Sequence, residues 1–75
     1  MVTLTEALDR IDSAEIYYKN MSHTFKDYPQ NKYYIRSRIK GLGEQFEDNI
    51  EIVTRVNALY LKLLESWWKI NLVLN

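Results

Sequence analysis

The chain contains no cysteine, one histidine, one proline and two glycines among its 75 residues. The absence of cysteine excludes disulfide bonds and thiolate metal sites, and it is compatible with a reducing cytosol. A single histidine, His23, leaves little side-chain chemistry for catalysis, and we expect it to be a solvated surface residue. We therefore predict a protein that is not an enzyme and that uses no cofactor and no metal ion.

Neither sign of charge is in excess, because ten basic residues balance ten acidic ones. A neutral chain lacks the electrostatic signature of a nucleic-acid-binding protein, so we expect no nucleic-acid partner, although residues 32–40 are rich in Lys and Arg. Charged residues also interrupt the apolar runs at both ends of the chain, so we expect neither a signal peptide nor a membrane span. The interrupting residues are Glu6, Asp9 and Arg10, and then Lys62, Glu65 and Lys69.

Apolar residues recur at alternating intervals of three and four along the whole chain. One core position falls at Leu4, Ile11, Tyr18, Phe25, Lys32, Ile39, Phe46, Val53, Tyr60, Trp67 and Leu74. The other falls at Ala7, Ala14, Met21, Tyr28, Ile35, Leu42, Asn49, Val56, Leu63 and Ile70. This heptad pattern is typical of helices that bury one stripe against other helices. It predicts an all-α fold.

The local signals divide this pattern into two helices in one domain, residues 1–75. Thr3 and Glu6 fit a capping box, so helix 1 is expected at about 4–27. Pro29 disfavours helix at the residue before it and places a turn at about 28–30. A long helix is then expected at about 31–74. The predicted fold is an antiparallel helical hairpin with coiled-coil-type heptad packing.

Gly41 and Gly43 leave a second fold open. Each glycine weakens a helix by up to about 1 kcal/mol relative to alanine. No Ser, Thr or Asp stands ready to cap a new helix at Glu44, and the apolar spacing continues through Leu42, which favours one long helix that is bent at the glycines. The alternative is a three-helix bundle broken at Gly41–Gly43.

The stripe contains two polar residues and passes through an aromatic-rich turn. Asn49 either fixes the helix register from a buried position or lies at the edge, with Ile50 taking the core position. Lys32 follows the turn, where its ammonium group can reach water. An aromatic cluster is expected to close this end of the hairpin. Its members are Tyr17, Tyr18, Phe25, Tyr28, Tyr33 and Tyr34.

The C-terminal part of the long helix is predicted to bind a partner. Helix 1 can cover the long helix only to about Arg55, and residues 56–75 are apolar around most of the helix circumference. Trp67 belongs to the stripe, whereas Trp68 points about 100° away from it. The expected partner-binding residues are Leu61, Leu64, Trp68 and Leu72. In the competing interpretation, both tryptophans are buried in a compact three-helix core.

Three segments together resemble the small co-chaperones of type III secretion needle subunits. They are residues 1–8 (MVTLTEAL), the turn at 27–31 (DYPQN) and the apolar, aromatic C-terminal helix. The resemblance implies a short cytoplasmic helical hairpin with no catalytic residues and a role in virulence. It also implies a tetratricopeptide-like chaperone as partner, the pair keeping the needle subunit soluble before export. The alternative is a self-assembling coiled-coil homodimer with a structural or phage-type role.

Overall fold

The computed structural model describes the backbone of residues 1–74 and the side chains of residues 1–64. Three helices pack together: α1 (Leu4–Met21), α2 (Asn31–Ile39) and α4 (Ile50–Leu74). A 3₁₀ turn, η1 (Ser22–Thr24), follows α1, and a single helical turn, α3 (Leu42–Gln45), connects α2 to α4. No strand occurs in residues 1–74, so the prediction of an all-α fold is confirmed.

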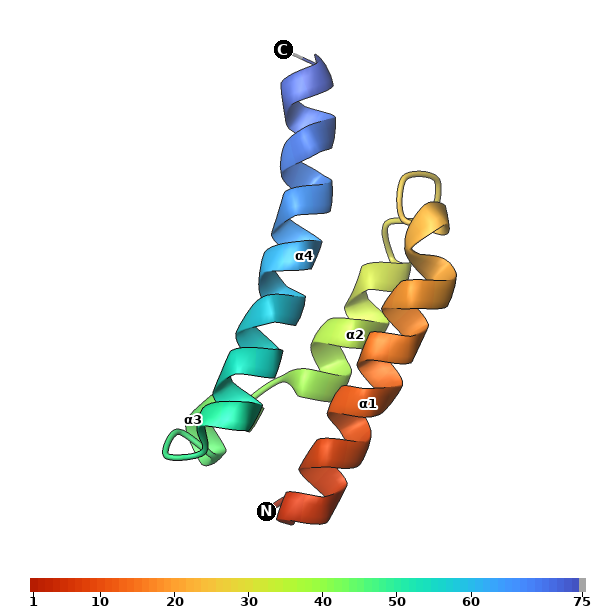
Figure 1. Ribbon diagram of the computed structural model, residues 1–75. Coiled ribbons are helices and arrows are strands. Elements are labelled where there is room, and N and C mark those ends of the chain that lie inside the picture. The colour runs from red at the N-terminus through yellow and green to blue at the C-terminus, as the bar shows by residue number, and fades with distance from the viewer. Residues whose placement is uncertain (75) are drawn as a thin grey trace.

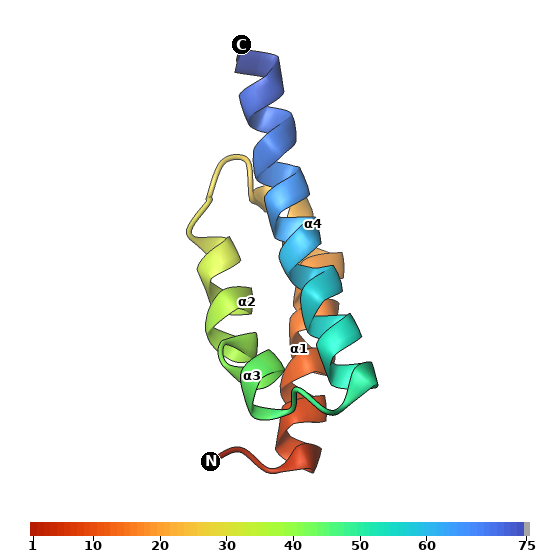
Figure 2. The ribbon, with the colours of Figure 1, turned by 90° about the vertical axis from the view of Figure 1, so that its left-hand side faces the viewer.

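The chain reverses direction twice. Helix α2 runs antiparallel to α1, and α4 runs back alongside both, in the same general direction as α1 (Figure 1). The second view shows α2 and α1 on different sides of α4, with the backbone of α4 projecting beyond the connection between α1 and α2 (Figure 2). The molecule is elongated, 41 × 20 × 17 Å, because α4 is much longer than the helices that support it.

The predicted helix at about 31–74 is interrupted in the structure, and the first interruption lies at Gly41. Lys40 leaves the helical conformation with φ −57° and ψ 129°, and Gly41 then adopts the left-handed conformation with φ 78°. Glycine enters this region without the steric penalty that a Cβ atom imposes. The glycine segment is therefore a true turn that ends α2. The structure has the three packed helices of the alternative prediction, the bundle broken at Gly41–Gly43.

The second interruption ends at Asn49, which caps α4. Its side-chain Oδ1 accepts a hydrogen bond from the backbone N–H of Ile52 at 3.1 Å. Ile50 is 81% exposed, so both predicted roles of Asn49, as a buried register residue and as an edge residue beside a buried Ile50, are wrong. No capping residue precedes Glu44 because the third packed helix begins six residues later, after the turn of α3.

Helix α1 begins as expected and ends earlier than expected. The Thr3 hydroxyl accepts a hydrogen bond from the Glu6 N–H at 3.1 Å, which confirms this residue as the N-cap. The helix was expected to reach about residue 27, but it ends at Met21 because Thr24 offers the backbone another partner. The Thr24 hydroxyl donates to the Met21 carbonyl at 2.6 Å and accepts from the Asn31 side chain at 2.9 Å.

The core lies where the three helices meet. Its buried apolar residues are Ala7, Ile11, Ala14, Phe25, Ile35, Ile39, Leu42, Ile52, Val56, Leu59 and Leu63. In α4, Ile52 and Leu59 are buried, whereas the predicted stripe positions Val53 and Tyr60 are only half-buried. The apolar face of α4 is wider than a heptad stripe and slightly rotated from it, because α4 packs against two helices at once.

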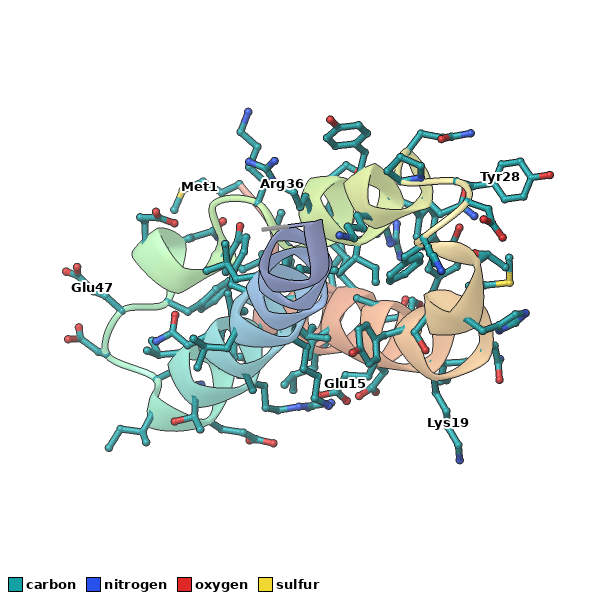
Figure 3. All side chains as sticks on the ribbon, turned by 90° about the horizontal axis from the view of Figure 1, so that it is seen from above. Met1, Glu15, Lys19, Tyr28, Arg36 and Glu47 are labelled. Atoms are coloured by element: carbon teal, nitrogen blue, oxygen red, sulfur yellow. The ribbon has the colours of Figure 1, made fainter. Side chains whose placement is uncertain are left out.

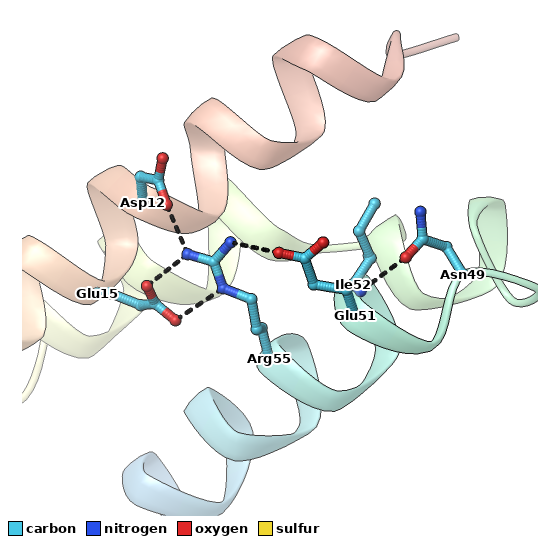
Figure 4. A network of polar contacts seen from close by, with 6 residues as sticks. All are labelled: Asp12, Glu15, Asn49, Glu51, Ile52 and Arg55. Carbon is cyan, nitrogen blue, oxygen red and sulfur yellow. Dashed lines mark hydrogen bonds and ion pairs between the residues drawn. The ribbon is translucent and has the colours of Figure 1, made fainter.

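Arg55 joins α4 to α1 through charge-assisted hydrogen bonds (Figure 4). Its guanidinium donates to both carboxylate oxygens of Glu15, at 2.6 and 3.2 Å, and to Asp12. Glu51, one turn earlier on α4, lies 3.7 Å away. These bonds, with Glu15 contributing most, raise the pKa of Arg55 above its ordinary value. A paired, two-oxygen contact of this kind fixes the rotation of α4 relative to α1.

We predict that Gly41→Ala lowers the free energy of unfolding by about 1–2 kcal/mol, because alanine is strained in the left-handed region. Gly43→Ala is the matched control. A Cβ atom there meets only Val56 Cγ1 at 3.9 Å, an ordinary contact, so stability should stay the same or rise. Urea unfolding of the two variants measures the difference, and equal stabilities would contradict the assigned turn.

We predict that Asn49→Ala lowers the free energy of unfolding by about 1 kcal/mol, because the Ile52 N–H loses its side-chain acceptor. Asn49→Asp retains an acceptor oxygen and should unfold at nearly the wild-type temperature in a thermal melt monitored by circular dichroism. If Asn49→Ala and Asn49→Asp have the same melting temperature, the cap does not contribute to the stability of α4.

Candidate functional site

The outer side of α4 exposes two leucines of the predicted partner-binding set. Leu61 and Leu64 are each 64% exposed, although both lie on a helix whose opposite side is fully buried. Trp68 and Leu72 lie outside the residues whose side chains are described. Their positions follow Leu61 and Leu64 at helical spacing, and the backbone of α4 stays helical through both.

These leucines are exposed because their side chains point away from the core, on a helix that extends beyond α1 and α2. It has 25 residues, compared with 18 in α1 and 9 in α2. The predicted overhang therefore persists in a different fold, but it begins later than expected. Val56, Leu59 and Leu63, all placed in the overhang from the sequence, are buried against α1 and α2.

A pocket of about 450 Å³ opens beside this face, between the first turns of α2 and the middle of α4. Its walls are mainly apolar and aromatic, and they include two basic side chains. The lining residues are Pro29, Lys32, Tyr33, Arg36, Tyr60, Leu63 and Leu64. Leu64 belongs both to the pocket and to the exposed face, so the two features form one continuous surface.

Lys32 is buried in this pocket, with 8% of its surface exposed. Most of its side chain is therefore packed against neighbouring groups, and this burial lowers the pKa of Lys32. Arg36, one turn further along α2, is exposed and lines the same pocket. Within residues 1–64, no carboxylate forms an ion pair with either basic group.

The view from above shows which elements carry the labelled charged residues, with Lys19 and Glu15 both on the α1 side (Figure 3). Arg36 projects from the α2 side, whereas Glu15 lies on the opposite, α1 side, where Arg55 already holds it. Glu47 extends from the far end, near α3. The pocket is therefore a local positive site in a chain with no net charge.

Part of the predicted aromatic cluster lies next to this pocket. The rings of Tyr17 and Tyr34 are 4.3 Å apart between centroids, and those of Tyr18 and Phe25 are 5.9 Å apart. Lys62 of α4 lies over the Tyr18 ring, 5.4 Å from its centroid. These contacts hold the end of α1 against α2 and α4. Tyr28 and Tyr33 are instead exposed, and Tyr33 forms a wall of the pocket.

The other candidate groups do not form a site. His23 is exposed, as expected for a surface residue. The acidic residues Glu44, Glu47, Asp48 and Glu51 are exposed as well. Across the described residues, no group of three or more acidic or histidine side chains is placed to hold a metal ion, and no helix is long and apolar enough to cross a membrane.

No protein-family model, curated protein or solved structure matches this chain. The sequence indicated the α4 face but not the pocket, because the pocket combines residues from α2 and α4 that meet only when α4 folds back. The available signal was Lys32, a charged residue at a position where the pattern calls for an apolar one.

We predict that Lys32→Met raises the free energy of unfolding by about 1 kcal/mol at pH 7, because it removes a desolvated charge and keeps an unbranched side chain of nearly the same length. Lys19→Met, at an exposed position of α1, is the control and should have little effect. Denaturant unfolding of the three proteins provides the comparison, and a destabilised Lys32→Met would contradict the assigned cost.

The same substitution should change the dependence of stability on pH. Since burial lowers the pKa of Lys32 from 10.5, the unfolded chain binds this proton more tightly than the folded one. The stability contributed by this group therefore rises as the pH approaches 10.5 and is constant above it. Lys32→Met should lack this rise, so its advantage over the wild type shrinks at alkaline pH.

Proposed function

We propose that this chain is a non-enzymatic protein-binding module that docks a partner protein along the outer face of α4. The observation that supports the proposal is the 64% exposure of both Leu61 and Leu64. These leucines lie beside an apolar pocket, on a helix that extends beyond α1 and α2. A contiguous apolar face of this kind marks an interaction surface more often than a solvated one. Trp68 and Leu72 are proposed to extend the same face.

The partner that we propose is a tetratricopeptide-like chaperone, and the pair would keep a type III secretion needle subunit soluble in the cytoplasm before export. The support is the resemblance of residues 1–8, of the turn at 27–31 and of the apolar C-terminal helix to the small co-chaperones of that system. Helical-repeat proteins present an extended concave surface, which suits a projecting helix with an apolar face.

A homodimer is the second candidate. The exposed leucines lie one helical turn apart on a straight, projecting helix, which is the arrangement that lets α4 pair with α4 of a second copy. Such a contact would be isologous, with the same residues contributed by both chains. The two candidates differ in composition, so the mass and the partners of the complex isolated from the native host distinguish them.

We predict that Leu61→Ala combined with Leu64→Ala weakens association at least tenfold, which corresponds to about 1.4 kcal/mol. Trp68→Ala alone should cost about 2 kcal/mol or more, as expected for an aromatic anchor at an interface. Helix content should not change on truncating the leucines, because both are exposed in the isolated chain. Binding is measured by sedimentation velocity for the homodimer and by co-purification and titration for the chaperone complex.

Ile16→Ala is the matched control for these variants. Ile16 is 60% exposed and apolar, but it lies on α1, away from the proposed face. Its truncation should leave association unchanged. Equal weakening by Ile16→Ala and by the leucine variant would contradict docking on α4, as would full binding by the leucine variant.

A further inference from the structure

The pocket beside the α4 face contains a charged residue at a core position, which the fold does not require. Lys32 occupies a core position of the heptad pattern, is 8% exposed and forms no ion pair within residues 1–64. Desolvation of this charge lowers stability, and an apolar residue would fill this position better. Features that cost stability without a structural benefit are commonly found at functional sites.

Lys32 and Arg36 are placed to act together. They lie four residues apart on α2, so their side chains project from the same side of the helix. Both line the pocket, whose remaining walls are the apolar and aromatic groups of α2, α4 and Pro29. Two cationic donors at the edge of an apolar cavity favour one chemical class of occupant, a carboxylate carried on an apolar body.

We propose that this pocket receives an Asp or Glu side chain from an apolar helix of the partner protein, and that the carboxylate pairs with Lys32 and Arg36. The inference rests on the proposed function, because it takes the partner to lie along α4. Leu64 connects the face and the pocket, because it belongs to the exposed face and also lines the pocket. A helix that covers Leu61 and Leu64 therefore passes the mouth of the pocket.

The arrangement would make docking selective. Apolar contact along α4 provides affinity for many apolar helices, whereas covering Lys32 without supplying a counter-charge penalises helices that bring no acid. Docking of an acidic residue removes that penalty, because the ammonium group gains a counter-charge as it loses its remaining water. A nucleic acid is a poorer match, since the walls are apolar and the site offers only two cations.

The test uses the whole chain and a phage-displayed library of 20-residue amphipathic helices, with a constant leucine and alanine face and all other positions randomised. Peptides selected on the wild type are synthesised in two forms, one with the selected Asp or Glu and one with the corresponding amide. Each form is titrated against the wild type, against Lys32→Met with Arg36→Gln, and against Leu61→Ala with Leu64→Ala. Lys26→Gln, at an exposed residue of the connecting loop, is the charge control.

We expect the selected peptides to share an acidic residue, and its amide form to bind the wild type at least tenfold more weakly. That difference should fall below twofold in Lys32→Met with Arg36→Gln and persist in Lys26→Gln. Such a double-mutant cycle isolates the pairing from any general effect of charge. On binding, the pKa of the Lys32 ammonium, followed by NMR, should rise.

The outcomes separate this inference from the proposed function. If the leucine variant loses binding but acid and amide forms bind the wild type equally, docking on α4 stands and the carboxylate pairing is overturned. If the preference for acid persists without Lys32 and Arg36, the pairing is again overturned. If no peptide binds, or if Leu61→Ala with Leu64→Ala binds the peptides as tightly as the wild type does, both proposals fail.

Discussion

The left-handed backbone of Gly41 is the constraint on which the rest of the structure depends. At φ 78° the chain leaves α2, makes the single turn of α3 and returns as α4 alongside both earlier helices. A continuous helix would carry the apolar residues of α4 beyond the reach of α1, whereas the turn buries Ile52, Val56 and Leu59 against it and α2. Burying these side chains, at about 1.5–3 kcal/mol each, outweighs the cost of ending one helix and starting another.

Helix α4 contacts α1, the core and the pocket beside α2, and the rotation of the helix determines which residues face each of them. Arg55 faces α1, where Glu15 and Asp12 hold its guanidinium. The buried residues face the core, and Tyr60 and Leu63 face the pocket beside α2. With these sides occupied, Leu61 points outward and Leu64 lies at the edge of the pocket, and each remains 64% exposed. The proposed partner face is therefore a consequence of how the core and the Arg55 contacts orient the helix.

The pocket and the face differ in what they contribute. In the proposed complex, the leucines would supply apolar area, which gives affinity but discriminates little among apolar partners. The buried Lys32 and the neighbouring Arg36 add a charge requirement at the edge of that area. A small chain with a limited core has little stability to spare, and the proposed pairing with an acidic residue would offset the cost of a desolvated lysine at a core position.

The sequence by itself determined that the chain is all-α, that Thr3 caps the first helix, that Pro29 lies in a turn and that Leu61 and Leu64 form an unsupported face. Each follows from short-range chemistry or from helical spacing. Only the tertiary structure decided that Gly41 is a turn, that Asn49 is a cap and that Lys32 and Arg36 line a pocket. A glycine bends or breaks a helix at similar local cost, about 1 kcal/mol, so long-range packing makes that choice. The pocket exists only because this choice brings α4 back beside α2.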